Sequence, residues 1–90
     1  MIFQKGKSYF IRTVTYHAVG KLKEEDDGFL VLENASWVAN SGTFSKAINE
    51  GILHECEKIN GNYYIQICSI VDAFDWTHEL PTENIPKRLS

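Results

Sequence analysis

The chain has 90 residues and a formal net charge of −3, with nine Lys plus Arg against twelve Asp plus Glu. This charge excludes a general nucleic-acid-coating protein, because such binding depends on many phosphate contacts. Hydrophobic residues make up 43% of the chain, which is typical of a globular protein, and the length favours one domain. We predict a single β-rich domain over residues 1–78 and a C-terminal tail over residues 79–90.

The first predicted element is one long strand over residues 7–19. This stretch is rich in Tyr, Phe, Ile, Val and Thr and contains no Pro or Gly. Each of its two sides is apolar at the ends and polar in the middle, with Arg12 on one side and Thr13, Thr15 and His17 on the other. Because neither side resembles a solvent face, we expect the chain's own core to cover one side and a second copy of the chain to cover the other.

The next predicted strands follow an acidic turn. Asp27 and Gly28 are a hairpin-turn signal, and they join a short extended piece at residues 21–23 to an apolar strand at residues 29–32. Two polar residues interrupt this run, and residues 35–39 are extended again.

One short helix is predicted after a polar loop. Thr43 or Ser45 can cap its start, and the helix continues through Glu50. Gly51 occupies the position where a left-handed residue commonly ends a helix.

A second hairpin is predicted after the helix. Residues 52–59 alternate in polarity, Asn-Gly-Asn at 60–62 is a strong turn signal, and residues 63–67 return as the partner strand. Residues 70–71 and 74–76 add a last short extended piece. The predicted fold class is therefore mainly β (α+β), a small bent antiparallel sheet or an SH3-like or Sm-like barrel with one short helix.

Catalytic and metal-binding motifs are not found in the sequence. There is no Gly-x-Ser-x-Gly elbow, Walker loop or Gly-x-Gly-x-x-Gly pattern. His54, Cys56 and Cys68, with His17, are zinc-ligand types, but they include no Cys-x-x-Cys and form an incomplete set. We therefore predict no enzyme activity, no cofactor and no metal site.

The expected compartment is the cytosol. No apolar run approaches the length of a membrane span, and the N-terminal residues lack the long apolar core of a signal peptide. In this compartment the two cysteines, Cys56 and Cys68, are expected to be reduced thiols.

Several side chains can instead bind a small anionic ligand. A mid-strand Arg12 needs a partner, which is either one of the chain's own acids or a phosphate or carboxylate group. Trp37 is either a core residue or a platform on which a base stacks. Donors at about 7 Å intervals along the predicted strand come from Thr13, Thr15 and His17. Amides and hydroxyls that can surround an anion before the helix come from Asn40, Ser41, Thr43 and Ser45.

Three stretches of the sequence resemble a family of small proteins from bacterial viruses: FIRTVTYHAVGKL, FLVLENASWVANSGTFSKAINEG and IVDAFDW. The family pattern is an Arg-Thr-Val-Thr strand, an Ala-x-Trp-[Ile/Val]-Ala segment, a Gly-x-Phe-Ser turn and a short helix. The likeness runs from Tyr9 to Trp76. It is similar to the phage anti-CBASS sponges, which bind the cyclic nucleotide signals of bacterial immunity without cleaving them. Such sponges are oligomers with ligand pockets between subunits.

The resemblance implies an immune-evasion sponge for a cyclic nucleotide such as the cyclic dinucleotide cGAMP. It implies a homodimer or homotetramer in the host bacterial cytoplasm, with no DNA or membrane partner. In this reading Arg12 pairs with phosphate, and Trp37 or Tyr16 stacks on a base. Thr43 departs from the family pattern, in which Arg is common, so a hydroxyl would make that phosphate contact. The alternative is an Sm-like or SH3-like RNA-binding or protein-interaction module of a phage. The predicted ligand-binding residues are Arg12, Thr13, Thr15, Tyr16, His17, Trp37, Asn40, Ser41, Thr43 and Ser45.

Overall fold

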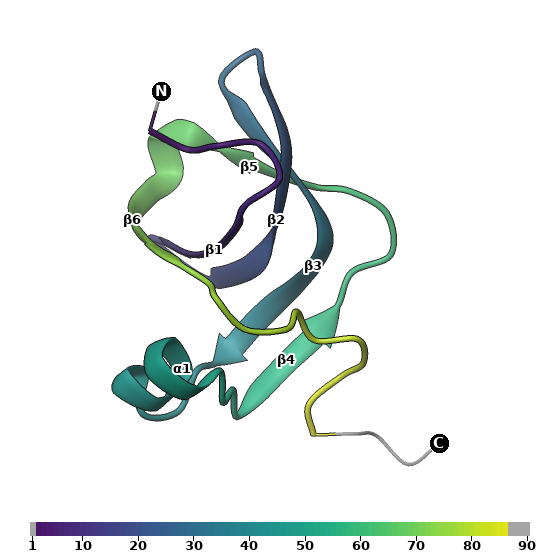
Figure 1. The fold of residues 1–90 in the computed structure, drawn as a ribbon. Helices are drawn as coiled ribbons and strands as arrows, with labels where there is room; N and C mark the ends of the chain where they lie inside the picture. The colour runs from purple at the N-terminus through teal and green to yellow at the C-terminus, as the bar shows by residue number, and fades with distance from the viewer. Residues whose placement is uncertain (1, 87–90) are drawn as a thin grey trace.

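The computed structural model describes residues 2–86 and confirms a mainly β fold with one short α-helix (Figure 1). Its antiparallel sheet is bent and open, with strand order β4-β3-β2-β1-β6, and β5 also pairs with β3. No helix among the described residues is long and apolar enough to cross a membrane. The elements in chain order are β1 (Ser8–Thr13), β2 (His17–Asp26), β3 (Phe29–Asn40), α1 (Phe44–Glu50), β4 (Glu55–Lys58), β5 (Tyr63–Gln66), the 3-10 helix η1 (Ile67–Ser69) and β6 (Ile70–Asp75).

The predicted long strand over residues 7–19 is wrong, because this stretch forms a hairpin. β1 ends at Thr13 and β2 begins at His17. The Thr13 hydroxyl closes the turn: its Oγ1 donates to the carbonyl oxygen of Tyr16 at 2.6 Å and accepts from the Tyr16 N–H at 3.0 Å. This bonding replaces the Gly, Asn or Asp that usually marks a turn. The expected row of Thr13, Thr15 and His17 on one strand face is therefore broken by the turn.

Two local predictions are confirmed. Asp27 and Gly28 form the two-residue turn between β2 and β3, with φ angles of 50° and 81°. α1 begins after Thr43 and ends before Gly51, whose φ of 75° is left-handed and whose N–H donates to the Ala47 carbonyl. Both signals act within a few residues of chain, so they do not depend on tertiary contacts.

The predicted hairpin around residues 60–62 is wrong. β4 pairs with residues 36–40 of β3, and β5 pairs with residues 29–32 of the same strand. β3 has twelve residues, which is long enough to hold both partners one after the other. Because both β4 and β5 are antiparallel to β3, they run in the same direction, and the chain continues along β3 through residues 60–62 instead of reversing there.

A bulge bends the sheet between the two halves of β3. Asn34 has a φ of 50°, and the register of β2 with β3 shifts between Val19 and Lys21, the two neighbours of Gly20. A Cβ placed at Gly20 would lie 2.9 Å from the Cβ of Ala35, which is closer than real side-chain contacts. Glycine therefore allows the two strands to approach closely at the bend.

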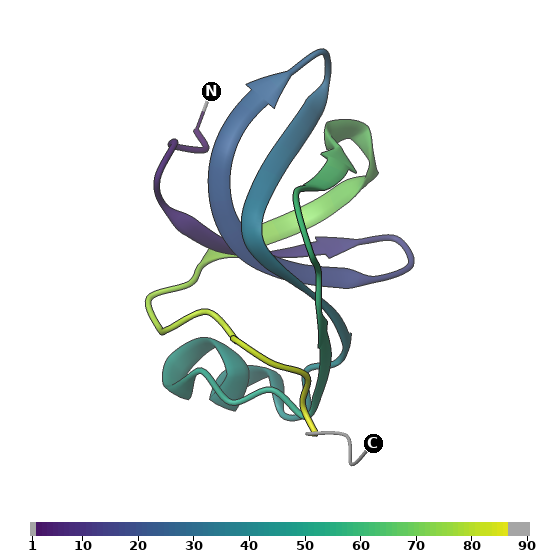
Figure 2. The ribbon, with the colours of Figure 1, turned by 90° about the vertical axis from the view of Figure 1, so that its right-hand side faces the viewer.

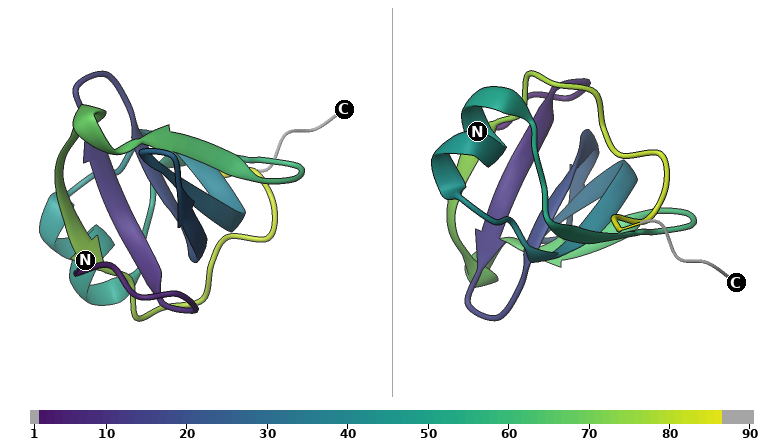
Figure 3. Two further views of the ribbon diagram at one scale, coloured as in Figure 1. Left: turned by 90° about the horizontal axis from the view of Figure 1, so that it is seen from above. Right: turned by 90° about the horizontal axis from the view of Figure 1, so that it is seen from below.

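Figure 3 shows the bent sheet, and each of its faces carries a hydrophobic core. β1 contributes to both, and its two faces are covered by this chain alone, so a second copy is not needed for that purpose. The inner core consists of Tyr9, Ile11, Ala18, Leu22, Leu30, Leu32, Ala35 and Ile65. The outer core, which α1 and the C-terminal segment help to form, consists of Phe10, Val19, Val38, Ala47, Leu53, Cys56 and Trp76.

Residues 79–86 of the predicted tail lie on the outer core. Ile85 exchanges backbone hydrogen bonds with Cys56 of β4, at N–O distances of 2.8 and 3.0 Å. Asn84 Oδ1 accepts a hydrogen bond from the Lys58 N–H at 2.8 Å, and the side chains of Leu80 and Ile85 pack against the core. The prolines and mixed polarity of this segment indicated a loose tail, but its apolar residues anchor it. The remaining tail residues, 87–90, lie outside the described part of the chain.

Candidate functional site

The predicted ligand-binding residues come from the end of the β1–β2 hairpin, the last part of β3 and the segment that leads into α1. Residues 12–17 form the end of the β1–β2 hairpin, whose turn projects from the sheet (Figure 2). His17 pairs with Val38 near the end of β3, and residues 40–45 continue from there into α1. We call this set the tip surface: Arg12, Thr13, Thr15, Tyr16, His17, Trp37, Asn40, Ser41, Thr43 and Ser45.

Arg12 is paired with an acid of its own chain. Its Nε donates to Asp72 Oδ1 at 2.6 Å, and its second terminal nitrogen donates to Asp72 Oδ2. Asp72 lies opposite Arg12 in the β1–β6 pairing, so the sheet register itself brings the two together. About a third of each side chain remains exposed, 36% for Arg12 and 35% for Asp72. Of the two partners that the sequence left open, the structure contains the internal acid.

This pair is flanked by two aromatic rings. The centre of the Arg12 guanidinium lies 5.1 Å from the ring centroid of Phe44 on α1 and 5.6 Å from that of Phe74 on β6. The two phenyl rings also contact each other edge to face, with centroids 5.0 Å apart. Three elements therefore fix the direction of the guanidinium, and cation–π attraction adds to its ion pair.

The electrostatics favour both ionised forms. The hydrogen bonds from Arg12 lower the pKa of the Asp72 carboxyl; partial desolvation opposes this, and the charges of Arg12 and His17 reinforce it. The same hydrogen bonds raise the pKa of Arg12. Asp72 is thus a carboxylate held in place, and it neutralises the charge that was expected to meet phosphate.

His17 lies beside this pair with an unsatisfied ring nitrogen. It is opposite Arg12 in the β1–β2 pairing, and its ring centroid is 5.7 Å from that of Phe10 in the outer core. Its Nδ1 is buried and has no hydrogen-bond partner among the described residues. A ring nitrogen in this position can still accept or donate a hydrogen bond, depending on its tautomer.

An aromatic pair of an exposed Tyr16 and a half-buried Trp37 lies on the other face of the sheet. Tyr16 and Trp37 contact each other edge to face, with centroids 4.9 Å apart, and Tyr16 is 52% exposed. Trp37 is opposite Ala18 of the inner core, whereas its neighbour Val38 belongs to the outer core. Because successive residues of a strand point to opposite faces, Trp37 and Arg12 are on different faces of the sheet. One copy of the chain therefore does not bring them into a single pocket.

The loop before α1 is organised by its own hydrogen bonds. Asn40 Oδ1 accepts from the Gly42 N–H at 2.8 Å, and Thr43 makes no side-chain capping bond to the helix. Gly42 has a φ of 71°, and a Cβ there would lie 2.6 Å from the His54 ring. Ser41 is half-buried, while Thr43 and Ser45 are exposed. The hydroxyls of Thr43 and Ser45 are therefore accessible.

Sequence reasoning missed the residues that hold Arg12. Asp72 interrupts an apolar run on β6, and an acid in such a strand is a signal for a basic partner on a neighbouring strand. Phe44 is the Phe of the Gly-x-Phe-Ser pattern, but its contact with Arg12 could not be predicted because it depends on where α1 packs.

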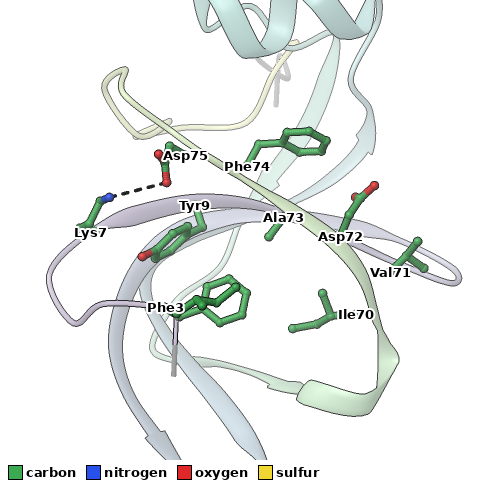
Figure 4. Close-up of a pocket in the computed structure, with 10 residues that line it drawn as sticks. Phe3, Lys7, Tyr9, Ile70, Val71, Asp72, Ala73, Phe74 and Asp75 are labelled. Atoms are coloured by element: carbon green, nitrogen blue, oxygen red, sulfur yellow. Dashed lines mark ion pairs between the residues drawn. The ribbon is translucent and has the colours of Figure 1, made fainter.

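The groove drawn in Figure 4 is separate from the tip surface. It has a volume of about 360 Å³ and lies between the N-terminal segment and β6, with the Lys7–Asp75 ion pair at one end. Phe3, Tyr9 and Ile70 line its apolar part. None of the ten predicted ligand-binding residues borders it.

The zinc-ligand types do not gather within residues 2–86. No group of three or more His, Cys, Asp or Glu side chains in that range is placed to hold a metal ion. Cys56 is buried in the outer core, where desolvation raises the pKa of its thiol, and Cys68 is exposed. His78 instead contacts the end of α1, with Nε2 2.8 Å from the Ile48 carbonyl oxygen.

Three comparisons with known proteins, against family models, curated proteins and solved structures, each found no match.

Proposed function

We propose that this protein binds a cyclic nucleotide signal and holds it without cleaving it, as a phage immune-evasion sponge in the host cytoplasm. The observation that carries the proposal is that three kinds of group are supplied by the β1–β2 hairpin, the last part of β3 and the segment that leads into α1. They are an oriented guanidinium, a partly exposed aromatic pair, and several hydroxyls and amides. These groups suit phosphate, base and ribose respectively. The family resemblance of the sequence favours the same class of ligand.

Arg12 can contact phosphate while it remains paired with Asp72. A guanidinium has five N–H donors, and Asp72 accepts from Nε and one terminal nitrogen. The other terminal nitrogen is left for a phosphate oxygen, in a direction fixed by Asp72, Phe44 and Phe74. The ion pair thus makes Arg12 a neutralised and oriented donor, which suits a compact anion better than a long polyanion.

Tyr16 and Trp37 supply the stacking part of the proposed site. An edge-to-face pair leaves ring surface available to a planar base, and base stacking on aromatic side chains contributes about 1–3 kcal/mol. Tyr16 is more than half exposed, so a base reaches it without rearrangement of the core.

Self-association follows from the placement of these groups. Because Arg12 and Trp37 are on opposite faces of one sheet, a nucleotide contacts both kinds of group only where two copies meet. We therefore propose a homodimer or homotetramer with the ligand between copies. This reason for self-association replaces the one from the sequence, since both faces of β1 are covered by the chain's own cores.

A thermal-shift screen tests the proposal with cyclic dinucleotides, cyclic trinucleotides, linear dinucleotides and short RNA as probes. A cyclic nucleotide should raise the melting temperature, and Trp37→Ala should abolish the rise. Tyr64→Ala is the matched control, because Tyr64 is an exposed aromatic residue on β5. Sedimentation with and without ligand reports the number of copies, and release of intact ligand on denaturation separates capture from cleavage.

Three outcomes would contradict the proposal. If no cyclic nucleotide raises the melting temperature, the sponge function is ruled out. If Trp37→Ala leaves the rise unchanged, the assigned site is wrong. Binding that strengthens with RNA length and weakens steeply with salt indicates the alternative RNA-binding module.

A further inference from the structure

The far end of the β2–β3 hairpin presents an apolar surface with an acidic border. The register places Glu24 opposite Val31 and Val31 opposite Tyr64, and in the next row Asp26 lies opposite Phe29. The alternating residues of β3 and β5, among them Leu30 and Ile65, point into the inner core. The other side chains therefore point away from that core and form the docking face: Glu24, Asp26, Asp27, Phe29, Val31 and Tyr64.

The centre of the docking face is apolar, and its two rings are accessible. Phe29 is 37% exposed and Tyr64 is 60% exposed, whereas Val31 is buried. Together they line a shallow groove with a volume of about 420 Å³. An outward face of a small sheet is usually polar, so two exposed rings beside each other favour a contact surface.

The border of the docking face carries uncompensated negative charge. Residues 24–27 are four consecutive acids, and neither of the two ion pairs found among residues 2–86 includes any of them. At the tip surface, by contrast, the acid Asp72 is paired with Arg12. Charge complementarity therefore selects a cationic occupant and excludes nucleic acid and anionic membrane.

We propose that the docking face binds a basic segment of a partner protein. Arg or Lys stems lie across Phe29, Val31 and Tyr64, because long basic side chains cover apolar surface with their methylenes. Their charged heads reach Glu24 and Asp26 and also attract the aromatic rings. One Arg or Lys side chain thereby contacts both the apolar and the acidic part of the face. A small inorganic cation would contact only the acidic part.

This surface is independent of the proposed nucleotide site. The β2–β3 turn lies at the opposite end of the molecule from α1, as Figure 1 shows. A partner protein and a nucleotide can therefore bind together, and the failure of one proposal leaves the other standing.

Fluorescence anisotropy with a labelled peptide of alternating Arg and Gly tests the docking face on the full chain. Tyr64→Ala should weaken binding by about fivefold, because it removes an exposed ring from the contact. The double variant Glu24→Gln, Asp26→Asn should weaken it by about tenfold at low salt. The controls are Trp37→Ala at the tip surface and the double variant Glu79→Gln, Glu83→Gln, which removes two exposed acids elsewhere. Both controls should bind like the unmodified protein.

Four results would overturn this inference. The first is no binding of the Arg-Gly peptide at about 1 mM. The second is an equal loss in the Glu79→Gln, Glu83→Gln control, which would indicate attraction to net charge alone. The third is peptide binding unchanged by Tyr64→Ala, and the fourth is equal binding of spermine, which would assign the face to a free polyamine.

Discussion

The inner and outer cores of this protein are built in different ways. The inner core lies within the sheet, and its residues come from β1, β2, β3 and β5, whose backbones are hydrogen-bonded into one ladder. The outer core joins the other face of the sheet to α1 and residues 76–86. A short chain thus buries both faces of one strand, and paired strands contribute to both cores, but the outer core also depends on a helix and on the segment after β6.

This difference predicts unequal local stability. α1 has seven residues, and an isolated helix of that length is not stable, so packing must hold it. The segment after β6 is tied to β4 by the bonds of Ile85 and Asn84. We therefore expect the outer core to open before the inner core does.

The largest expected effect is that of Phe10→Ala. Phe10 is fully buried, and its ring lies 6.1 Å from Trp76 and 6.3 Å from Phe44, centroid to centroid. Removing it should lower the free energy of unfolding by about 3–5 kcal/mol, because it leaves a cavity where β1, α1 and the C-terminal segment meet. Urea unfolding measures the loss. Phe29→Ala, at a partly exposed position, should cost much less, and an equal cost would contradict the picture of the outer core.

A smaller effect is expected from Leu80→Ala combined with Ile85→Ala. These half-buried residues cover the outer core, and their truncation should cost about 2 kcal/mol. The more specific readout is thiol labelling. Cys68 is exposed and should react quickly, while Cys56 is buried with a raised pKa and should react slowly.

In the double variant Cys56 should react faster, while amide exchange in β2 stays slow. This pattern would localise the opening to the outer core. Equal acceleration of exchange in β2 would mean that the two cores open as one unit.

The smallest expected effect is a pH dependence at the Arg12–Asp72 pair. Because the pKa of Asp72 is lower in the folded than in the unfolded chain, its stabilising contribution is present above the unfolded value. That contribution is lost as the pH falls through the folded pKa, below about pH 4. Urea unfolding of Asp72→Asn and of Arg12→Gln should show the same loss of this acid-side dependence. The effect is small because both side chains are partly exposed, and unequal responses of the two variants would contradict a mutual pair.

The fold could be predicted from the sequence where a signal is local. The Asp27-Gly28 turn and the Gly51 helix end each require a left-handed backbone, and both were visible in the residue types. The turn after Thr13 was not visible, because Val14, Thr15 and Tyr16 are all good strand formers. It is held by the Thr13 hydroxyl and by a backbone hydrogen bond from the Thr13 N–H to the Tyr16 carbonyl, and a propensity pattern does not distinguish Thr13 from an ordinary strand threonine.

Long-range pairing could not be predicted from these patterns. The Asn-Gly-Asn signal predicted a reversal that does not occur, because β4 and β5 run in the same direction and each pairs with β3 instead of with the other. For the same reason the partner of Arg12 stayed open between ligand and acid, since the β1–β6 register decides it. The ten residues of the tip surface stay a prediction from the sequence, and their division between two faces depends on the hairpin.

The pairing of Ile85 with Cys56 protects the rim of the sheet as well as its outer core. β4 is the edge strand on that side of the sheet. Without this cover, its free backbone N–H and C=O groups could pair with an extended segment of another chain. A protease cut near Thr82 would thus expose the edge of β4 to strand pairing with other copies of the chain, in addition to any loss of packing.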